Sequence, residues 1–349
     1  MICSRRKVGK ILANTGESIF QVIHVIRSRR KMRTVTNLLL LNLAVADLSF
    51  VVICPPFTAY QMATSQWPFP GLVGDVICKL MHYLLNVTVY VTIYTLVVIS
   101  IIRWLTIVHN AATMALRTIT NTIMIIVGIW IIMLSVNVPI LFSHGVQEIP
   151  MPDNKTVNPI CDNYGYEPGR KIYGTFFAFA YLLPLSVIAG FSFSILHHIK
   201  SQQPTTLSKK NSKSSQRKKQ AARLIILVIV IFAIFWLPVH IHLLVAYSTE
   251  DLPNSKFYRC LAVLWYFLAY LNSCINPLIY NYASKDFRDS FTETVLCKKP
   301  SPEWDREASV ITRVVNRKKN GEKEAVAEIN GIENNNGDIN GGHDEPCIE

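Results

Sequence analysis

Long stretches without charge are the feature that most limits how this chain can fold. Residues 123–142 and 224–237 contain no Asp, Glu, Lys or Arg. Apolar runs of roughly 20 residues are long enough to cross a bilayer as a helix. A helix in a soluble core is apolar along one stripe, whereas these segments are apolar on every side. The pattern therefore favours an integral membrane protein over a soluble protein with buried helices.

Six spans are predicted where apolar runs lie between polar breaks. They are residues 37–63, 75–108, 119–142, 172–199, 222–247 and 257–282. Residues 11–26 are short and polar for a seventh. We expect residues 1–26 to hold a truncated or atypical first helix, or a piece lying at the membrane interface. The prediction is an all-α integral membrane fold, a seven-transmembrane helix bundle with a short or defective first helix.

The formal charge of +12 raises the question of nucleic-acid binding, because basic proteins are attracted to phosphate. The basic residues gather in two connections, residues 27–33 and 200–223, with no stacking aromatics between them. We therefore expect no nucleic acid and a lipid bilayer instead. The positive-inside rule makes both connections cytoplasmic, and the four spans between them return the chain to the same side. The C-terminus is then cytoplasmic as well, in a multi-pass plasma-membrane protein.

The chain changes character after its last apolar span. Residues 27–297 are the expected seven-transmembrane core, and residues 298–349 are polar enough to be a disordered tail. Residues 285–296 place Phe287 and Phe291 on one face, as a short amphipathic eighth helix would. Cys297 follows and is a candidate for palmitoylation, with an unmodified surface thiol as the alternative.

Asp47 is a carboxylate deep in an apolar span, where an unpaired charge is costly. It therefore needs polar partners. Candidates at similar depth are Thr92, Ser100, Asn272, Ser273 and Asn276. A polar network that holds water or a sodium ion is one hypothesis, and a neutral, hydrogen-bonded Asp that stabilises the bundle is the other.

Polar and aromatic side chains recur at helical spacing near the expected outer ends of three spans. Such faces indicate either core packing or the walls of a cavity open to the exterior. The pairs His82 and Asn86, Trp236 and His240, and Tyr266 and Tyr270 form these faces, and the remaining candidate pocket residues are Trp67, Asp162 and Tyr164.

Other site types have weak support. The eight cysteines show no Cys-x-x-Cys spacing, so no metal site is expected, and no phosphate loop or nucleophile motif indicates an enzyme. Cys78 and Cys161 lie in connections expected to face an oxidising exterior. Of two glycosylation sequons, only Asn154 lies in a polar connection, whereas Asn86 falls inside a span.

Five separated motifs resemble those of the rhodopsin-like G-protein-coupled receptors, over about residues 27–297. They are the run Asn42 to Asp47, Cys78, Trp130, Phe232 with Trp236 to Pro238, and Asn276 to Tyr280. Trp67 to Phe69, Tyr94 to Leu96 and His240 are similar to the galanin and allatostatin-A receptor group in particular.

The resemblance implies a disulfide between Cys78 and Cys161. It implies an extracellular peptide ligand, often amidated at its C-terminus, and a heterotrimeric G-protein partner of the inhibitory class. It also implies that agonist binding shifts an existing equilibrium and swings the helix of Trp236 outward around Pro238. The residues expected at the G-protein switch are Arg103, Lys218, Arg223 and Tyr280.

The chain departs from the family pattern at both ends of this switch. Ile102 stands where the family has an acidic residue before Arg103, and Ser192 stands where the fifth helix usually has a tyrosine. The first change should favour the active state and the second should disfavour it. We therefore keep two alternatives to a signalling neuropeptide receptor: a non-signalling receptor relic, and a channel or transporter, for which no internal repeat is found.

Overall fold

A computed structural model describes nine parts of the chain. These are residues 19–20, 23–24, 34–64, 66–109, 113, 117–150, 157–201, 212–248 and 256–283. The chain divides into two compact units, Met1–Arg288 and Asp289–Glu349, and the second lies outside the described residues. The expected tail at 298–349 and surface helix at 285–296 also lie outside them. Of the expected first helix, only residues 19–20 and 23–24 are described, as helix.

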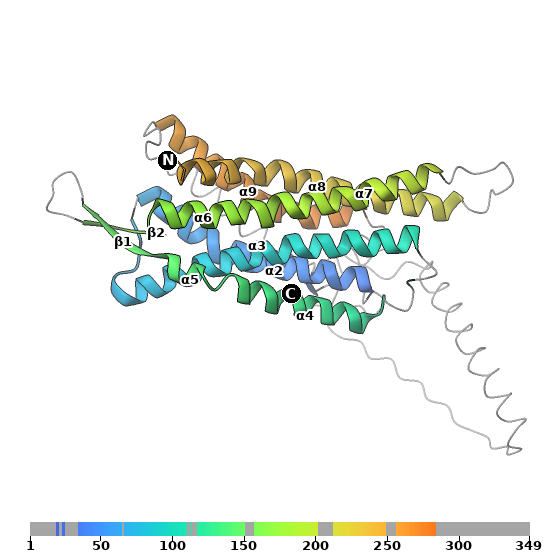
Figure 1. The fold of residues 1–349 in the computed structure, drawn as a ribbon, viewed down its shortest axis with the longest axis horizontal. Coiled ribbons are helices and arrows are strands. Elements are labelled where there is room, and N and C mark those ends of the chain that lie inside the picture. The colour runs from blue at the N-terminus through green and yellow to red at the C-terminus, as the bar shows by residue number, and fades with distance from the viewer. Residues whose placement is uncertain are drawn as a thin grey trace, which may run out of the picture. The chain divides into compact units, whose positions relative to one another are not determined.

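Long helices lying side by side make up the described part of the first unit (Figure 1). In chain order they are α2 (Val35–Thr64), α3 (Gly71–Val108), α4 (Ile119–Val136), α5 (Ile140–Ser143), α6 (Tyr166–Phe177), the π-helical segment η3 (Ala178–Leu182), α7 (Leu183–Ser201), α8 (Ser212–Ala246) and α9 (Lys256–Ala283). Because α6, η3 and α7 follow one another without a break, they form one continuous helical rod.

Five helical stretches in the described residues are long and apolar enough to cross a membrane. They are Val35–Gln61, Gly71–Val108, Ile119–Ser143, Glu167–Ser201 and Ile226–Ala246, and a shorter apolar stretch is Cys260–Asn276. On α4, large apolar side chains such as Met124, Ile131 and Val136 are about as exposed as surface residues, at 58–60%. An apolar face of this size is unfavourable in water, whereas it is well solvated by the hydrocarbon of a bilayer.

Helix α3 is the central element of the bundle. Its buried residues run along the whole helix from Gly74 to Ile107, and it contacts α2, α4, α7 and the strand β1. Polar side chains such as Thr88, Thr95 and Ser100 are buried here. Each of these three hydroxyls donates to a carbonyl one turn earlier in α3, which satisfies it inside an apolar bundle. The sites described below therefore share α3 as their frame.

Proline and capping residues set the local helix boundaries. Thr118 accepts a hydrogen bond from the Asn121 backbone N–H and so caps the start of α4. Pro139 follows the turn after α4 and starts the short helix α5, because its ring removes a backbone donor and disfavours a continuous helix. The π-helical segment η3 ends just before Pro184, where a proline frees a carbonyl one turn back.

A two-stranded antiparallel sheet corrects the all-α expectation. Strand β1 (His144–Pro150) pairs with β2 (Val157–Asn163), with His144 opposite Asn163 and Val146 opposite Cys161. The hairpin lies at one end of the bundle, here named the hairpin end (Figure 1). Sequence periodicity missed it because the strands are short and polar, and their pairing satisfies backbone groups that no helix covers.

Helix α8 begins earlier than expected, inside the basic connection predicted at residues 200–223. It begins at Ser212, so its first turns contain the basic stretch that the charge pattern assigned to a loop. Lys, Arg, Gln and Ala are good helix formers, and a helix can continue past the bilayer surface into water.

Candidate functional site

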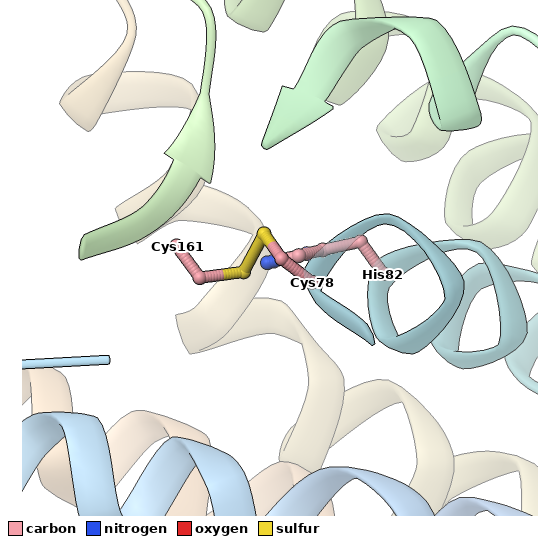
Figure 2. A group of neighbouring side chains, drawn as sticks. All are labelled: Cys78, His82 and Cys161. Atoms are coloured by element: carbon pink, nitrogen blue, oxygen red, sulfur yellow. A yellow bond between two sulfur atoms is a disulfide. The ribbon is translucent and has the colours of Figure 1, made fainter. Parts of the chain in front are cut away.

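A disulfide ties the hairpin to α3. The sulfur atoms of Cys78 and Cys161 are bonded at 2.02 Å, across 83 residues of chain (Figure 2). Trp67 packs against this bond, and its indole N–H donates to the Gly74 carbonyl at 3.0 Å. Gln61 on α2 donates to the Cys161 carbonyl at 3.0 Å. The disulfide implied by resemblance is confirmed, and its surroundings fix the hairpin over the ends of α2 and α3.

Trp67 belongs to this packing cluster, beside Phe57 and Phe69 and not beside the other pocket candidates. Tyr164 is exposed, and its hydroxyl lies 3.4 Å from the Asp75 carboxylate. Asp75 also accepts from the Val146 backbone N–H and pairs with Lys79. Trp67 and Tyr164 therefore hold the hairpin in place, a role that their sequence positions did not reveal.

His82 lies beside the disulfide on the next turn of α3 (Figure 2). A ligand atom of its ring and the two sulfur atoms lie within 4.8 Å of one another, which is close enough to suggest a metal site. The sulfur atoms are bonded to each other, however, and a disulfide offers no thiolate to a metal. Among the described residues, no other group of three His, Cys, Asp or Glu side chains comes this close together. With the disulfide intact, His82 is the only member of the group that could bind a metal ion, and one ligand does not make a metal site.

The ring of His82 stacks on His144, at the start of β1, with centroids 4.2 Å apart. His144 is bonded on both sides, to Ser143 at 2.9 Å and to the Tyr173 hydroxyl at 3.3 Å. Burial lowers the pKa of His144 to about 4, an effect that outweighs attraction to the Asp162 charge. His144 is therefore neutral at neutral pH, and sequence reasoning missed it because it lies outside the apolar spans.

Asp162 stands at the end of β2 and reaches across to α8. The hydroxyl of Tyr247 donates to Asp162 Oδ1 at 2.5 Å, and the Tyr247 ring lies 4.6 Å from that of Tyr173 on α6. Tyr266 of α9 lies within electrostatic range of the same carboxylate. Of the predicted pocket residues, Asp162 and Tyr266 are thus brought together at the hairpin end, together with Tyr173 and Tyr247, which were not predicted.

Trp236 and His240 line one face of α8 and meet aromatic rings from α6 and η3. His240 is 1% exposed, and its ring centroid lies 4.8 Å from that of Phe176 and 4.9 Å from that of Tyr181. The two ring nitrogens of His240 and Nε1 of Trp236 have no hydrogen-bond partner in the described residues. Buried polar atoms of this kind are costly, so they mark a place where another molecule can bond.

The other two pocket candidates are less central. Tyr270 packs on Phe50, which also contacts Trp236, so it joins the aromatic cluster from the side of α2 and α9. Asn86 is buried, and its side chain donates to the His82 carbonyl one turn back in α3. This bond lies within its own helix, and the place in the pocket wall that its helical spacing with His82 suggested stays a prediction.

Asp47 lies at a small cavity in the middle of the bundle. Its carboxylate is 2% exposed and accepts from Ser273 at 3.0 Å and from Asn276 at 2.7 Å. The cavity is lined by Asp47, Phe50, Thr88, Val89, Thr92, Phe232, Trp236, Asn272 and Ser273. The predicted polar partners Thr92, Asn272, Ser273 and Asn276 thus gather here, whereas Ser100 bonds within α3.

A second buried polar chain joins α2, α3 and α4. Asn42 donates to the Thr95 hydroxyl at 2.8 Å, and its amide oxygen accepts from the Trp130 indole N–H at 2.8 Å. Sequence reasoning singled out Asn42 and Trp130 as motif residues but did not foresee the bond between them. An amide in an apolar span was the available signal, because it must find both a donor and an acceptor.

At the opposite end of the bundle, named here the Arg103 end, α3 carries the expected switch arginine. Arg103 is half-buried and forms no ion pair within the described residues. The neighbouring Trp104 donates from its indole to the Ser194 hydroxyl of α7 at 2.9 Å and packs on Phe191. Lys218, Arg223 and Tyr280 lie in α8 and α9, but their side chains lie outside the described residues, as do Asn154 and Cys297.

The comparisons agree with this architecture. The family described as 7 transmembrane receptor (rhodopsin family) matches residues 20–280. The chain is 34% identical to the allatostatin-A receptor of Bombyx mori over 80% of this chain and 75% of that protein. It is 34% identical to galanin receptor type 1 of Homo sapiens, over 76% of this chain and 73% of that protein.

A third relative is somatostatin receptor type 2 of Mus musculus, which is 31% identical over 79% of this chain and 72% of that protein. The family match covers most of the chain, and the described residues include helices long and apolar enough to cross a membrane. The chain therefore belongs to the rhodopsin family of seven-transmembrane receptors, in the group of G-protein-coupled receptors that includes allatostatin-A and galanin receptors, and is not an enzyme.

Proposed function

We propose that this receptor binds a neuropeptide of the allatostatin-A or galanin kind at its hairpin end and signals through a heterotrimeric G protein at its Arg103 end. The observation that carries the proposal is the gathering of polar and aromatic side chains beneath the disulfide-tied hairpin, in a chain related to receptors for such peptides. The peptide would contact Asp162 and Tyr266 near the hairpin and the face of Trp236 and His240 more deeply.

An amidated C-terminus suits the deeper part of this pocket. Three ring nitrogens of Trp236 and His240 are buried and lack partners in the described part of the chain. A terminal carboxamide carries both a carbonyl acceptor and N–H donors, so it could bond an indole N–H and either form of an imidazole nitrogen. A free carboxylate would instead bring a charge into an aromatic site with no cation beside it among the described residues.

The orientation follows from charge and redox chemistry. The disulfide favours an oxidising exterior for the hairpin end. The basic residues that surround the start of α8 favour the cytoplasm for the Arg103 end, and the C-terminus would share that side. Glycosylation at Asn154 outside and palmitoylation at Cys297 inside are compatible with this orientation. The resemblance to galanin and allatostatin-A receptors leads us to expect a G protein of the inhibitory class.

Asp47 and its partners form a candidate sodium site. Oxygen ligands are available from the Asp47 carboxylate and from the hydroxyls of Thr92 and Ser273, around a cavity that also touches Trp236. A cation there would balance a carboxylate that has only neutral hydrogen-bond partners in the described residues. Because agonist contact with Trp236 would disturb the same cavity, ion and agonist would oppose each other.

A peptide screen tests the function. Cells expressing the chain are exposed to amidated peptides and to their free-acid forms, and G-protein activation is measured with and without pertussis toxin, which inactivates the inhibitory class. We expect one amidated peptide class to activate the receptor and the toxin to abolish the response. Surface expression with peptide binding but no response would select the receptor relic, and ion or solute flux without binding would select a channel or transporter.

A further inference from the structure

The carboxylate of Asp162 has no cationic partner in the described residues. Its Oδ1 accepts hydrogen bonds from the Tyr247 hydroxyl and, at 2.7 Å, from the Asn163 backbone N–H. Its Oδ2 accepts none within the described part of the chain, and neither of the two ion pairs found there includes it. The residue is half-buried at the hairpin end. A carboxyl group with one oxygen open to a further hydrogen bond therefore lies at the hairpin end, among the described residues.

Three tyrosines from separate segments of the chain lie near this carboxylate. Tyr247 lies just past the end of α8, the ring centroid of Tyr173 on α6 lies 4.6 Å from that of Tyr247 in a tilted arrangement, and Tyr266 on α9 lies within electrostatic range of Asp162. The face of a tyrosine ring is electronegative and attracts cations within about 6 Å of the ring centre. Asp162, Tyr173, Tyr247 and Tyr266 are called the Asp162 cluster below.

Backbone structure holds the cluster in place. The Tyr247 ring lies so close to Gly169 of α6 that an added Cβ would come within 2.1 Å of its Cδ1 atom. Only glycine at that position lets the ring approach α6 and reach Asp162. On the other side, Asp162 directly follows Cys161, so the disulfide to α3 fixes the carboxylate. The cluster is therefore built by segments far apart in the sequence.

We infer that the Asp162 cluster binds a cationic group of the peptide ligand, either an ammonium or a guanidinium. An ionised carboxylate only accepts hydrogen bonds, and a charged donor bonds it about twice as strongly as a neutral one. The neighbouring His144 does not supply that charge, because it is neutral at neutral pH. The inference rests on the proposed peptide-receptor function and adds the ligand chemistry recognised at the hairpin end.

Paired changes in receptor and peptide test the inference. An active amidated peptide from the screen is compared with forms in which each cationic group is neutralised, by acetylation of amines or by replacing Arg with citrulline. We expect Asp162→Asn to reduce the potency of the parent peptide about tenfold. One neutralised peptide should lose similar potency on the unchanged receptor and lose no more on Asp162→Asn. Additive losses, or no loss, would overturn the inference.

Glu167 provides the matched control, because it is an exposed carboxylate at the same end and is already paired with Lys171 at 2.8 Å. Glu167→Gln should leave potency unchanged. Surface staining checks that Asp162→Asn reaches the membrane. Tyr247→Phe, which keeps the ring but removes one of the two hydrogen bonds to Oδ1, gives a second variant. In Tyr247→Phe, the potency difference between the parent peptide and its neutralised form should become smaller but should not disappear.

A small cation separates this inference from the peptide function itself. Nα-acetyl-L-argininamide at millimolar concentration, whose only charge is its guanidinium, should raise the thermal unfolding temperature of the purified full-length receptor, and the uncharged Nα-acetyl-L-citrullinamide should not. The shift should persist in Glu167→Gln and vanish in Asp162→Asn. An equal shift in Asp162→Asn, or none in the unchanged receptor, would overturn the inference. A receptor that shows the shift but responds to no peptide would contradict the peptide function alone.

Discussion

The indole of Trp104 and the hydroxyl of Ser194 join α3 to α7 through a hydrogen bond of 2.9 Å. Trp104 also packs against Phe191, and Ile107 and Ile195 lie in the same small cluster. This link lies directly beside Arg103, which follows Ile102 in the sequence. The bond joins two helices at a place where the described residues contain no ion pair to Arg103.

Loss of the Trp104–Ser194 bond should raise basal signalling. Ser194→Ala and Trp104→Phe each remove one partner, and a hydrogen bond contributes roughly 1 kcal/mol. That energy corresponds to about a fivefold change in a two-state population, so basal nucleotide exchange on the G protein should rise by up to that factor. Exchange is measured without agonist in membranes containing equal amounts of receptor.

Ser186→Ala is the control for this experiment, because the Ser186 hydroxyl bonds only to the Leu182 carbonyl, among the described residues, one turn back in the same helical rod. It should leave exchange unchanged. Basal exchange that stays level or falls in both Trp104→Phe and Ser194→Ala would show that the bond does not restrain the inactive arrangement.

Ile102→Asp should lower basal signalling. The new carboxylate would lie next to Arg103, which has no ion pair in the described residues, and would restore a local restraint on the arginine. Ile102→Asn changes the shape in a similar way without adding charge, so it isolates the electrostatic part. Nucleotide exchange without agonist is the measurement. Equal effects of the Asp and Asn substitutions would reject the ion-pair explanation.

Asp47→Asn should abolish sodium sensitivity. In the unchanged receptor, sodium in place of an impermeant organic cation should reduce agonist affinity, because ion binding and agonist contact meet at the cavity that touches Trp236. The amide introduced by this substitution would keep the hydrogen bonds from Ser273 and Asn276 in part but carry no charge. Agonist binding is measured over a series of sodium concentrations. A sodium effect that survives Asp47→Asn would place the ion elsewhere.

Acid should destabilise the receptor through His144. Its pKa is about 4 in the folded chain because the ring is buried, against 6.5 for a free imidazole. The unfolded chain therefore binds more protons between these values, and stability falls as pH decreases from about 6.5 to about 4, by up to about 3 kcal/mol. The half-denaturation temperature in detergent should show this loss.

Several groups around His144 bear on the same titration. His82 stacks on it, Tyr173 bonds to its Nε2, and Asp162 attracts a proton to it. The specific contribution of His144 is therefore the difference between the unchanged receptor and His144→Gln, which should have a flatter pH profile. Parallel profiles for the two proteins would mean that another group carries the acid sensitivity.

Local sequence patterns determined much of this receptor. Apolar length alone predicted the helices, because a bilayer leaves a backbone few other ways to satisfy its hydrogen bonds. The cost of a charge in that setting also pointed to Asp47 and to its partners Ser273 and Asn276. Both conclusions depend on the cost of placing unbonded polar groups or charges in a bilayer. That cost applies to each residue separately, so one sequence is enough to reveal it.

Only the tertiary structure decided which side chains meet. Asp162 and Tyr247 are 85 residues apart, and Trp104 and Ser194 are 90 apart. No periodicity links such pairs, because their contact depends on how whole helices pack and on where the disulfide holds the hairpin. The same packing gives Trp67 and Tyr164 contacts that hold the hairpin, which their sequence positions did not reveal, and their expected place in the pocket stays a prediction.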